Sequence, residues 1–396
     1  MSLAAELATS IDRSVDDLSG QLGSLQERIH AHPELRFEEH NASQWIAELV
    51  QSHGWAVKRG IAGMTTALMA RAGTSGGPRV AILAEYDALP EIGHACGHNL
   101  IAAGAVGAFL AAASVVSGVG GEVVLLGTPA EEGGGGKVEM VKAGVFEAFD
   151  AAMMFHPFDR DLLAQGALAT VWLDFEFIGR SSHAAIAPHD GCSALTACMD
   201  AFHLVDGQRM RFRDGVRVHG VVTEGGKAVN VIPERAACEF QVRAPDEAEL
   251  DRVRGVLERC ARAAAMASDV GLRQTTRPGY KDMLDNLALA RRFGVHLQAL
   301  GRHPRERDPR AGLASTDMGD VSHVVPAIHP WLAIVDEGEA RCHERRFAEA
   351  SASRRAVDTA LVAAKALART AIELLGDAEL RAMVTAEWRE RGEPAR

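Results

Sequence analysis

The sequence has few cysteines and no excess of positive charge. The first feature argues against a disulfide-rich secreted domain, and the second argues against a protein that binds nucleic acid or anionic membranes. Its six cysteines are scattered along 396 residues, which favours reduced thiols over the dense disulfide framework of small secreted domains. The net charge is −11, so nucleic acids and anionic membranes would be repelled. Neither is expected as the main partner.

Long apolar runs and targeting signals are also missing. The longest apolar stretch, Leu100 to Val116, contains two glycines and is shorter than the roughly 20 residues that span a bilayer. It therefore predicts a buried helix. Residues 1–18 carry acidic side chains and lack a basic segment followed by an apolar one, so they predict an amphipathic helix rather than a signal peptide. We expect a cytoplasmic protein.

What is present indicates an α/β protein with two domains. Hydrophobic residues make up 47% of the chain, and its length suits two domains with a large core. Short apolar runs at 79–84, 122–126 and 151–155, separated by helical stretches, predict buried strands of a mostly parallel sheet with helices on both faces. The run at 331–335 is interpreted as a further strand of the same sheet.

The middle of the chain has another order, which predicts an inserted α+β domain of ferredoxin-like type. The expected elements are a strand at 171–178, a helix at 193–208, strands at 217–222 and 236–243, a helix at 247–267 and a strand at 271–276. The predicted insertion covers 168–279, and 1–167 with 280–396 form the first domain, which an amphipathic helix at 356–375 closes.

Residues able to bind metal or move protons follow each of the first three predicted strands. Asp87 follows the first strand, Glu131 and Glu132 follow the second, and His156 follows the third. Open α/β sheets bind their ligands beyond the carboxyl ends of the strands. We therefore expect a functional site at this edge.

Each candidate metal ligand is weak evidence alone, because a buried cysteine, a structural histidine or a solvated carboxylate is at least as common an explanation. Two adjacent carboxylates can divide their work, one binding metal while the other accepts a proton. The full set consists of Cys96, His98, Glu132, His156 and His343. Thiolate, imidazole and carboxylate are all ligands of transition-metal ions, so the set predicts a centre of two ions.

Several motifs between residues 84 and 330 carry a family resemblance: AEYDALPEIGHACGHN, GTPAEEGGGG, MMFHP, GRSSHAAIAPHDGCSAL, NVIPE and STDMGDVSHVVPAIHP. Through them the sequence resembles the co-catalytic metallopeptidases and amidohydrolases, which include aminoacylases, carboxypeptidases and indole-acetyl amino acid hydrolases. The resemblance is greatest to the branch of p-aminobenzoyl-glutamate hydrolases and aminoacylase-like dipeptidases. Many relatives carry aspartate where this chain has Asn99.

The resemblance implies a role for each site residue. The five ligands named above would hold two divalent ions, zinc or manganese, with cobalt or nickel as alternatives. Glu131 would be the general base, and Asp87 would orient the site from behind the ligands. The inserted domain would form a homodimer and a lid. In this dimer His183 would reach the partner subunit's site and stabilise the oxyanion, and Asn230 and Arg243 would bind the substrate.

The implied function is hydrolysis by a metal-activated water of the amide bond in a small N-acyl amino acid, dipeptide or aryl-amino acid conjugate. Two alternatives stay open at this point. One is an aminohydrolase (deaminase) that uses the same site to release ammonia from an aromatic amine. The other is a metal-bound binding dimer without catalysis.

Overall fold

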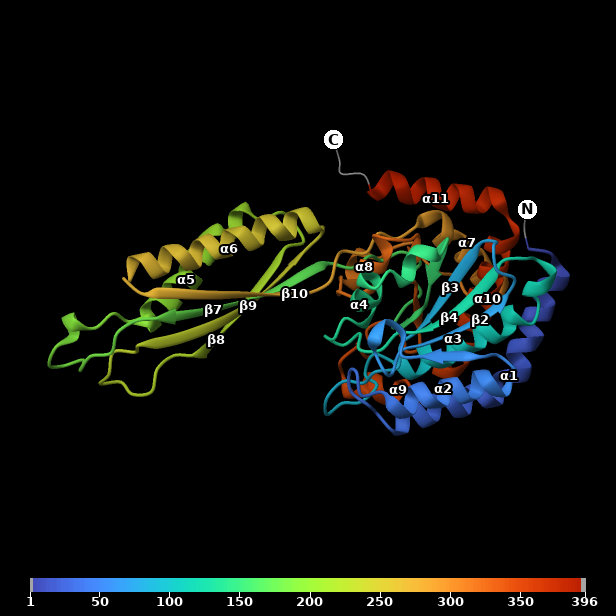
Figure 1. Ribbon diagram of the computed structural model, residues 1–396, viewed down its shortest axis with the longest axis horizontal. Helices are drawn as coiled ribbons and strands as arrows, with labels where there is room; N and C mark the ends of the chain where they lie inside the picture. The colour runs from blue at the N-terminus through green and yellow to red at the C-terminus, as the bar shows by residue number, and fades with distance from the viewer. Residues whose placement is uncertain (1–2, 393–396) are drawn as a thin grey trace. The chain divides into compact units, whose positions relative to one another are not determined.

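The computed structural model describes residues 3–392, which form two compact units (Figure 1). The first unit contains the chain up to Gly166, the segment Met283–Leu313 and the chain from Asp317 onward. The second contains Ala167–Asp282 and Ala314–Thr316. Among the described residues, no helix is both long and apolar enough to cross a membrane. All six cysteines are free thiols, as expected.

A six-stranded sheet forms the centre of the first unit. Its order is β1 (Val57–Arg59), β2 (Leu68–Gly73), β4 (Glu122–Gly127), β3 (Arg79–Ala84), β5 (Ala151–Met153) and β11 (Ala327–Ile328). The four strands β4, β3, β5 and β11 run parallel, whereas β2 is antiparallel to β4 and to β1. The strands predicted at 79–84 and 122–126 are confirmed, and the third one ends earlier than expected, at Met153.

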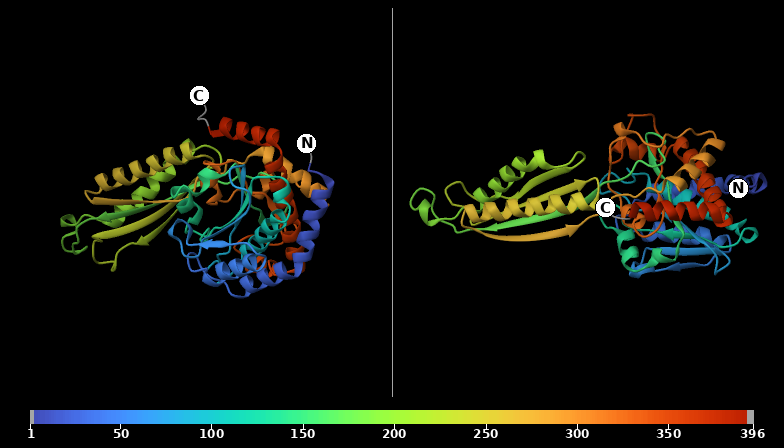
Figure 2. Two further views of the ribbon diagram at one scale, coloured as in Figure 1. Left: turned by 45° about the vertical axis from the view of Figure 1, so that its right-hand side comes forward. Right: turned by 90° about the horizontal axis from the view of Figure 1, so that it is seen from above.

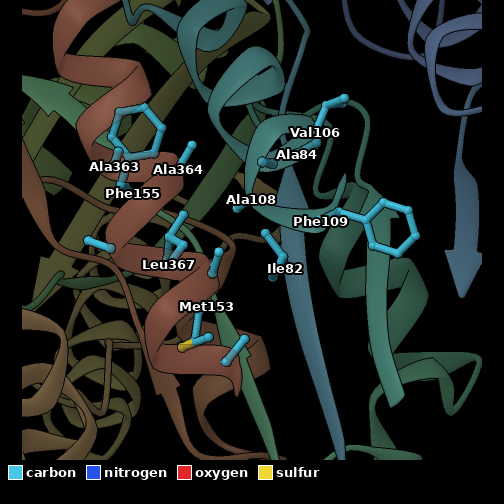
Figure 3. Packing of buried hydrophobic residues seen from close by; sticks show 14 of the residues in the cluster. Ile82, Ala84, Val106, Ala108, Phe109, Met153, Phe155, Ala363, Ala364 and Leu367 are labelled. Carbon is cyan, nitrogen blue, oxygen red and sulfur yellow. The ribbon is translucent and has the colours of Figure 1, made fainter. Parts of the chain in front are cut away.

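Two long helices, α3 (His98–Ala113) and α10 (Arg354–Gly376), pack against this sheet, and a third, α1 (Ala5–Ala31), packs against both of them. All residues of α3 are buried, because this helix lies among β3, β4, α1 and α10. A helix that is apolar all round needs such surroundings. Figure 3 shows the resulting core, in which side chains of β3, β5, α3 and α10 meet. The predicted buried helix and the amphipathic N-terminal helix are both confirmed.

Smaller elements complete the first unit. Its other α-helices are α2 (His40–Ser52), α4 (Gly136–Lys142), α7 (Leu287–Ala299), α8 (Met318–Ser322), α9 (Arg345–Ala350) and α11 (Ala378–Gly392).

The assignment of 331–335 to the main sheet is wrong. Strand β12 (Trp331–Ala333) pairs instead with β6 (His156–Phe158) in a separate two-stranded sheet. The outermost strand of the main sheet is β11, which contains two residues. Pro326 and Pro330 flank it closely, and a proline has no N–H to donate to a strand ladder. Strand β11 is therefore too short to be recognised in the sequence as an apolar run.

The second unit has the predicted β-α-β-β-α-β order. Its elements are β7 (Ala169–Ile178), α5 (Ala194–Gln208), β8 (Arg217–Glu224), β9 (Arg235–Ala244), α6 (Glu247–Ala267) and β10 (Gly271–Pro278). The sheet is antiparallel in the order β10-β7-β9-β8, and α5 and α6 pack on one of its faces (Figure 2). Alternate residues of β9 are buried, as expected for a sheet with one covered face. The ferredoxin-like fold is confirmed.

Candidate metal centre

The register of the parallel strands aligns their carboxyl ends at one edge of the main sheet. Ala84 pairs with Gly127 across β3 and β4, and Met153 of β5 pairs with both Ile82 and Ile328. The segments that follow these strands therefore begin side by side. This is the edge at which open α/β sheets bind ligands.

Side chains from four separate segments meet at this edge. Their candidate ligand atoms lie within 4.8 Å of one another in three overlapping groups, which are Cys96–His98–His156, Cys96–Glu132–His343 and His98–Glu131–Glu132. The structure thus brings together all five predicted ligands and the predicted general base. Geometry alone allows Glu131 to bind metal as well, since it belongs to one of the groups.

Backbone contacts hold the histidine-bearing segments close to Cys96. Gly97 precedes α3 with a φ of 74°, and a Cβ atom there would lie 2.9 Å from the Pro157 side chain. Only glycine allows this approach without strain. The His343 amide donates a hydrogen bond of 3.0 Å to the Ala95 carbonyl. This bond holds the segment before α9 next to the loop that contains Cys96.

The loop that carries the two adjacent carboxylates depends on the glycines that follow it. The carbonyl of Ala130 accepts hydrogen bonds from the amides of Gly134 and Gly135, at 3.2 and 2.7 Å. A Cβ atom at Gly136 would lie 1.9 Å from the Pro129 carbonyl oxygen. The tight turn presents Glu131 and Glu132 to the other ligands.

The tautomer of His98 provides a direct test of whether a cation fits. Its Nδ1 lies 2.9 Å from the Asp87 carbonyl oxygen and 3.0 Å from Asp87 Oδ1, and both oxygens only accept. Nδ1 therefore carries the hydrogen, and Nε2 of the neutral ring is left with a lone pair. Within the part of the chain that the structure describes, Nε2 makes no hydrogen bond.

Carboxylates surround that lone pair. Glu85 Oε2 lies 3.4 Å from His98 Nε2, and Glu131 Oε2 lies 4.0 Å away. Burial disfavours a charge on this ring, but Asp87, Glu85 and Glu132 outweigh burial and raise the pKa of His98 well above its usual value. The surroundings of Nε2 therefore favour a positive charge, which a metal ion bound to the neutral ring would supply in place of a second proton. Negative groups that face a lone pair favour a cation between them, so the site fits a metal ion.

His156 is arranged in a similar way. Its Nδ1 donates to the Pro157 carbonyl at 2.7 Å, which leaves Nε2 as the free nitrogen. Burial lowers the pKa of His156 to about 4, so the ring is neutral at physiological pH. Neutral imidazole is the form that binds metal.

Asp87 connects two of the candidate ligands from behind. One of its carboxylate oxygens accepts from His98 Nδ1, and the other accepts from the Glu132 amide at 2.8 Å. A carboxylate in this position fixes the tautomer and the orientation of a metal-bound histidine. These contacts support the orienting role expected for Asp87.

The other predicted residues lie in the second unit. His183 is exposed, and its Nδ1 accepts hydrogen bonds from the amides of Ala185 and Ile186, at 3.2 and 3.3 Å. Its Nε2 therefore carries the hydrogen and is available as a donor. Asn230 is exposed, and its carbonyl accepts from the Ala184 amide at 3.0 Å, which places it next to His183.

Arg243 lies on β9. Its guanidinium donates to the Ser315 hydroxyl at 2.8 Å. Burial lowers its pKa, yet a guanidinium remains charged in proteins. Arg243 can therefore bind an anionic group.

Comparison with known proteins identifies the family. Residues 166–269 match the peptidase dimerisation domain of the M20 family. The Xaa-Arg dipeptidase of Mus musculus is 35% identical to this chain, over 94% of the chain and 91% of the mouse protein. The chain belongs to the M20 family. It is accordingly a metal-dependent hydrolase of amide bonds.

Other M20 relatives extend the comparison. One of the subunits of the p-aminobenzoyl-glutamate hydrolase of Escherichia coli K12 is 32% identical, over 67% of this chain and 59% of that protein. A dinuclear metal-binding peptidase of the M20 family from Bacillus subtilis has the same fold, with a TM-score of 0.72, 19% identity and coverage of 91% of this chain and 99% of that one. The resemblance inferred from the motifs is thereby confirmed.

Three buried charged side chains beside this M20 centre have no counterpart among the predicted residues. Lys137 Nζ lies 2.6 Å from Glu85 Oε1 and 2.7 Å from Asp317 Oδ1. Burial opposes the charge on Lys137, but Asp317 and Glu85 outweigh it and raise its pKa above the usual value. Glu85 directly follows β3, so its position at the strand end could have identified it in the sequence as a candidate site residue. The sequence carries no signal that Lys137, next to four glycines, is buried.

Lys137→Met is expected to lower the free energy of unfolding by about 3–5 kcal/mol, because it leaves two buried carboxylates without their cation. Denaturant unfolding measures the change. Lys142→Met is the matched control, since Lys142 lies on the same helix and its ion pair with Glu139 is exposed; it should change stability by less than about 0.5 kcal/mol. Equal effects of the two substitutions would show that the buried cluster contributes nothing.

Proposed function

We propose that the protein hydrolyses the amide bond of small dipeptides or N-acyl amino acids at a centre of two divalent ions. The residues that would hold the ions are Cys96, His98, Glu132, His156 and His343. The observation that carries the proposal is their convergence with Glu131 at one sheet edge. The lone pair of His98 among carboxylates supports it further.

Glu131 is suited to move the proton in this reaction. Divalent ions bound here would lower the pKa of a water and polarise the amide carbonyl. Burial, and then the charges of Glu132, Glu85 and Asp317, raise the pKa of Glu131 well above its usual value. A carboxylate with a raised pKa accepts a proton from the attacking water more readily and can donate it to the leaving nitrogen.

Dipeptides that end in a basic residue are the first substrates we propose. A relative that matches almost the whole chain is an Xaa-Arg dipeptidase, and the net charge of −11 attracts cationic substrates. Arg243 would bind the terminal carboxylate of such a dipeptide, and Asn230 would bind a polar group of its backbone. Zinc or manganese would occupy the centre, with cobalt or nickel as alternatives.

We also propose that the inserted domain forms a homodimer in which His183 serves the partner subunit's site. Strand β8 lies at an edge of its sheet, where Val221 and Val222 are 57% and 42% exposed. Ile186 and Val229, on the loops near His183 and Asn230, are also exposed. Exposed strand edges and apolar side chains favour association with another chain.

A product analysis tests the reaction. The metal-loaded protein is incubated with Xaa-Arg and Xaa-Lys dipeptides, p-aminobenzoyl-glutamate and N-acyl amino acids, and the products are identified by mass spectrometry. We expect two products, one from each side of the amide bond, and the highest kcat/KM for the basic dipeptides. Release of ammonia without cleavage of the amide would contradict the proposal and support deamination.

A further inference from the structure

His329 is a buried histidine that lies beside the metal centre and has no assigned role. It directly follows β11, the fourth parallel strand, and so stands at the same edge as Asp87, Glu132 and His156. His329 is only 8% exposed. The ring centroid lies 5.3 Å from that of His156, which in turn lies 5.9 Å from that of His98.

A neighbouring tryptophan fixes the tautomer of His329. The indole Nε1 of Trp331 donates a hydrogen bond of 3.3 Å to His329 Nδ1. An indole N–H can only donate, so Nδ1 must offer a lone pair and the hydrogen of the neutral ring is on Nε2. The pairing of β12 with β6, which sets Trp331 opposite His156, holds this arrangement in place.

The Nε2–H of His329 has no acceptor among the described residues, although it is buried. An unsatisfied buried donor costs about 1–3 kcal/mol, and buried polar groups in native proteins nearly always have a partner. The missing acceptor is therefore expected to come from a molecule bound at the centre.

We propose that His329 Nε2 donates a hydrogen bond to the carbonyl oxygen of the scissile amide. The inference rests on the proposed function and adds a donor from the same chain as the metal centre. A neutral donor suits an oxygen that becomes negative only in the transition state, whereas the substrate carboxylate is better bound by a guanidinium such as that of Arg243. No atom of His329 exchanges a proton in this role.

Two substitutions distinguish the effect of losing the N–H donor from the effect of losing the ring. His329→Phe keeps a planar ring and removes the donor, and His329→Gln keeps an N–H near the position of Nε2. We expect His329→Phe to lower kcat by about 10²–10³-fold with little change in KM, and His329→Gln to recover a large part of that loss. Metal content should stay at the wild-type level in both. Both substitutions remove the acceptor of the Trp331 indole N–H, so thermal stability should fall by a similar amount in the two variants, and the difference in kcat between them reports the donor.

Several outcomes would overturn the inference. These are an unchanged kcat in His329→Phe, a rise in KM alone, loss of metal from both variants, or equal losses of kcat in the two variants at full metal content. ¹⁵N NMR of the histidine rings, with His329→Phe to assign the signal, tests the tautomer without any substrate; a hydrogen on Nδ1 would also refute it. Failure of the wild-type protein to cleave any amide would instead refute the proposed function.

Discussion

Replacing Glu131 with glutamine is expected to lower kcat/KM by about 10²–10⁴-fold, the usual contribution of a general base, while the metal content stays at the wild-type level. The amide of glutamine has nearly the shape of the carboxylate but cannot accept the proton of the attacking water. Steady-state kinetics on a cleavable dipeptide, together with metal analysis of the same sample, measure both quantities.

Two other glutamate substitutions make this test specific. Glu132→Gln should lose both metal and activity, because Glu132 is the proposed ligand of the pair. Glu139→Gln should change neither, since Glu139 lies nearby on α4 with an exposed side chain paired to Lys142. If Glu131→Gln loses metal as Glu132→Gln does, then Glu131 is a ligand and another group must be the base.

His183→Ala is expected to lower kcat by about 10²–10³-fold, as for loss of a donor to the developing oxyanion, without loss of metal. If His183 acts on the partner subunit's site, two inactive variants should complement each other. In a heterodimer of Glu131→Gln with His183→Ala, one site contains both changes and the other contains neither. That heterodimer should recover about half of the wild-type activity by symmetry.

Differently tagged protomers allow the heterodimer to be purified, and light scattering gives its mass. The two parent homodimers, mixed under conditions that prevent exchange of protomers, are the control and should remain inactive. An inactive heterodimer of the correct mass would show that His183 does not act across the interface. A monomeric wild-type protein with full activity would contradict the proposed dimer.

The sequence predicts that several site residues lie close together, because each of them follows a predicted strand of the parallel sheet. Asp87, Glu131 and His156 each follow a buried apolar run, and parallel strands bring their carboxyl ends to one edge. Cys96 lies before a helix that is apolar all round, which has only one place in such a fold, against the sheet. The apolar runs in the sequence are therefore enough to place these side chains at the carboxyl edge of the sheet.

The roles of His329, Lys137 and Asp317 cannot be predicted from the sequence, and neither can the position of the predicted ligand His343 beside the others. Strand β11 has two residues between two prolines, too few for an apolar run, so the run at 331–335 predicts a strand in its place. His329 lies in the motif STDMGDVSHVVPAIHP, but the motif gives no indication of its role. Lys137 and Asp317 are far apart in sequence, and only tertiary packing reveals that they form a buried ion pair. The place of His343 depends on a backbone contact with Ala95, which no local pattern encodes.

The central claim is that Cys96, His98, Glu132, His156 and His343 hold two divalent ions needed for turnover. Mass-spectrometric metal analysis of the purified protein, paired with an activity assay before and after chelation, tests it most directly. We predict about two ions per chain, loss of activity when the ions are removed, and recovery when zinc or manganese is restored. A protein that cleaves amides at an undiminished rate with its metal removed would contradict the claim.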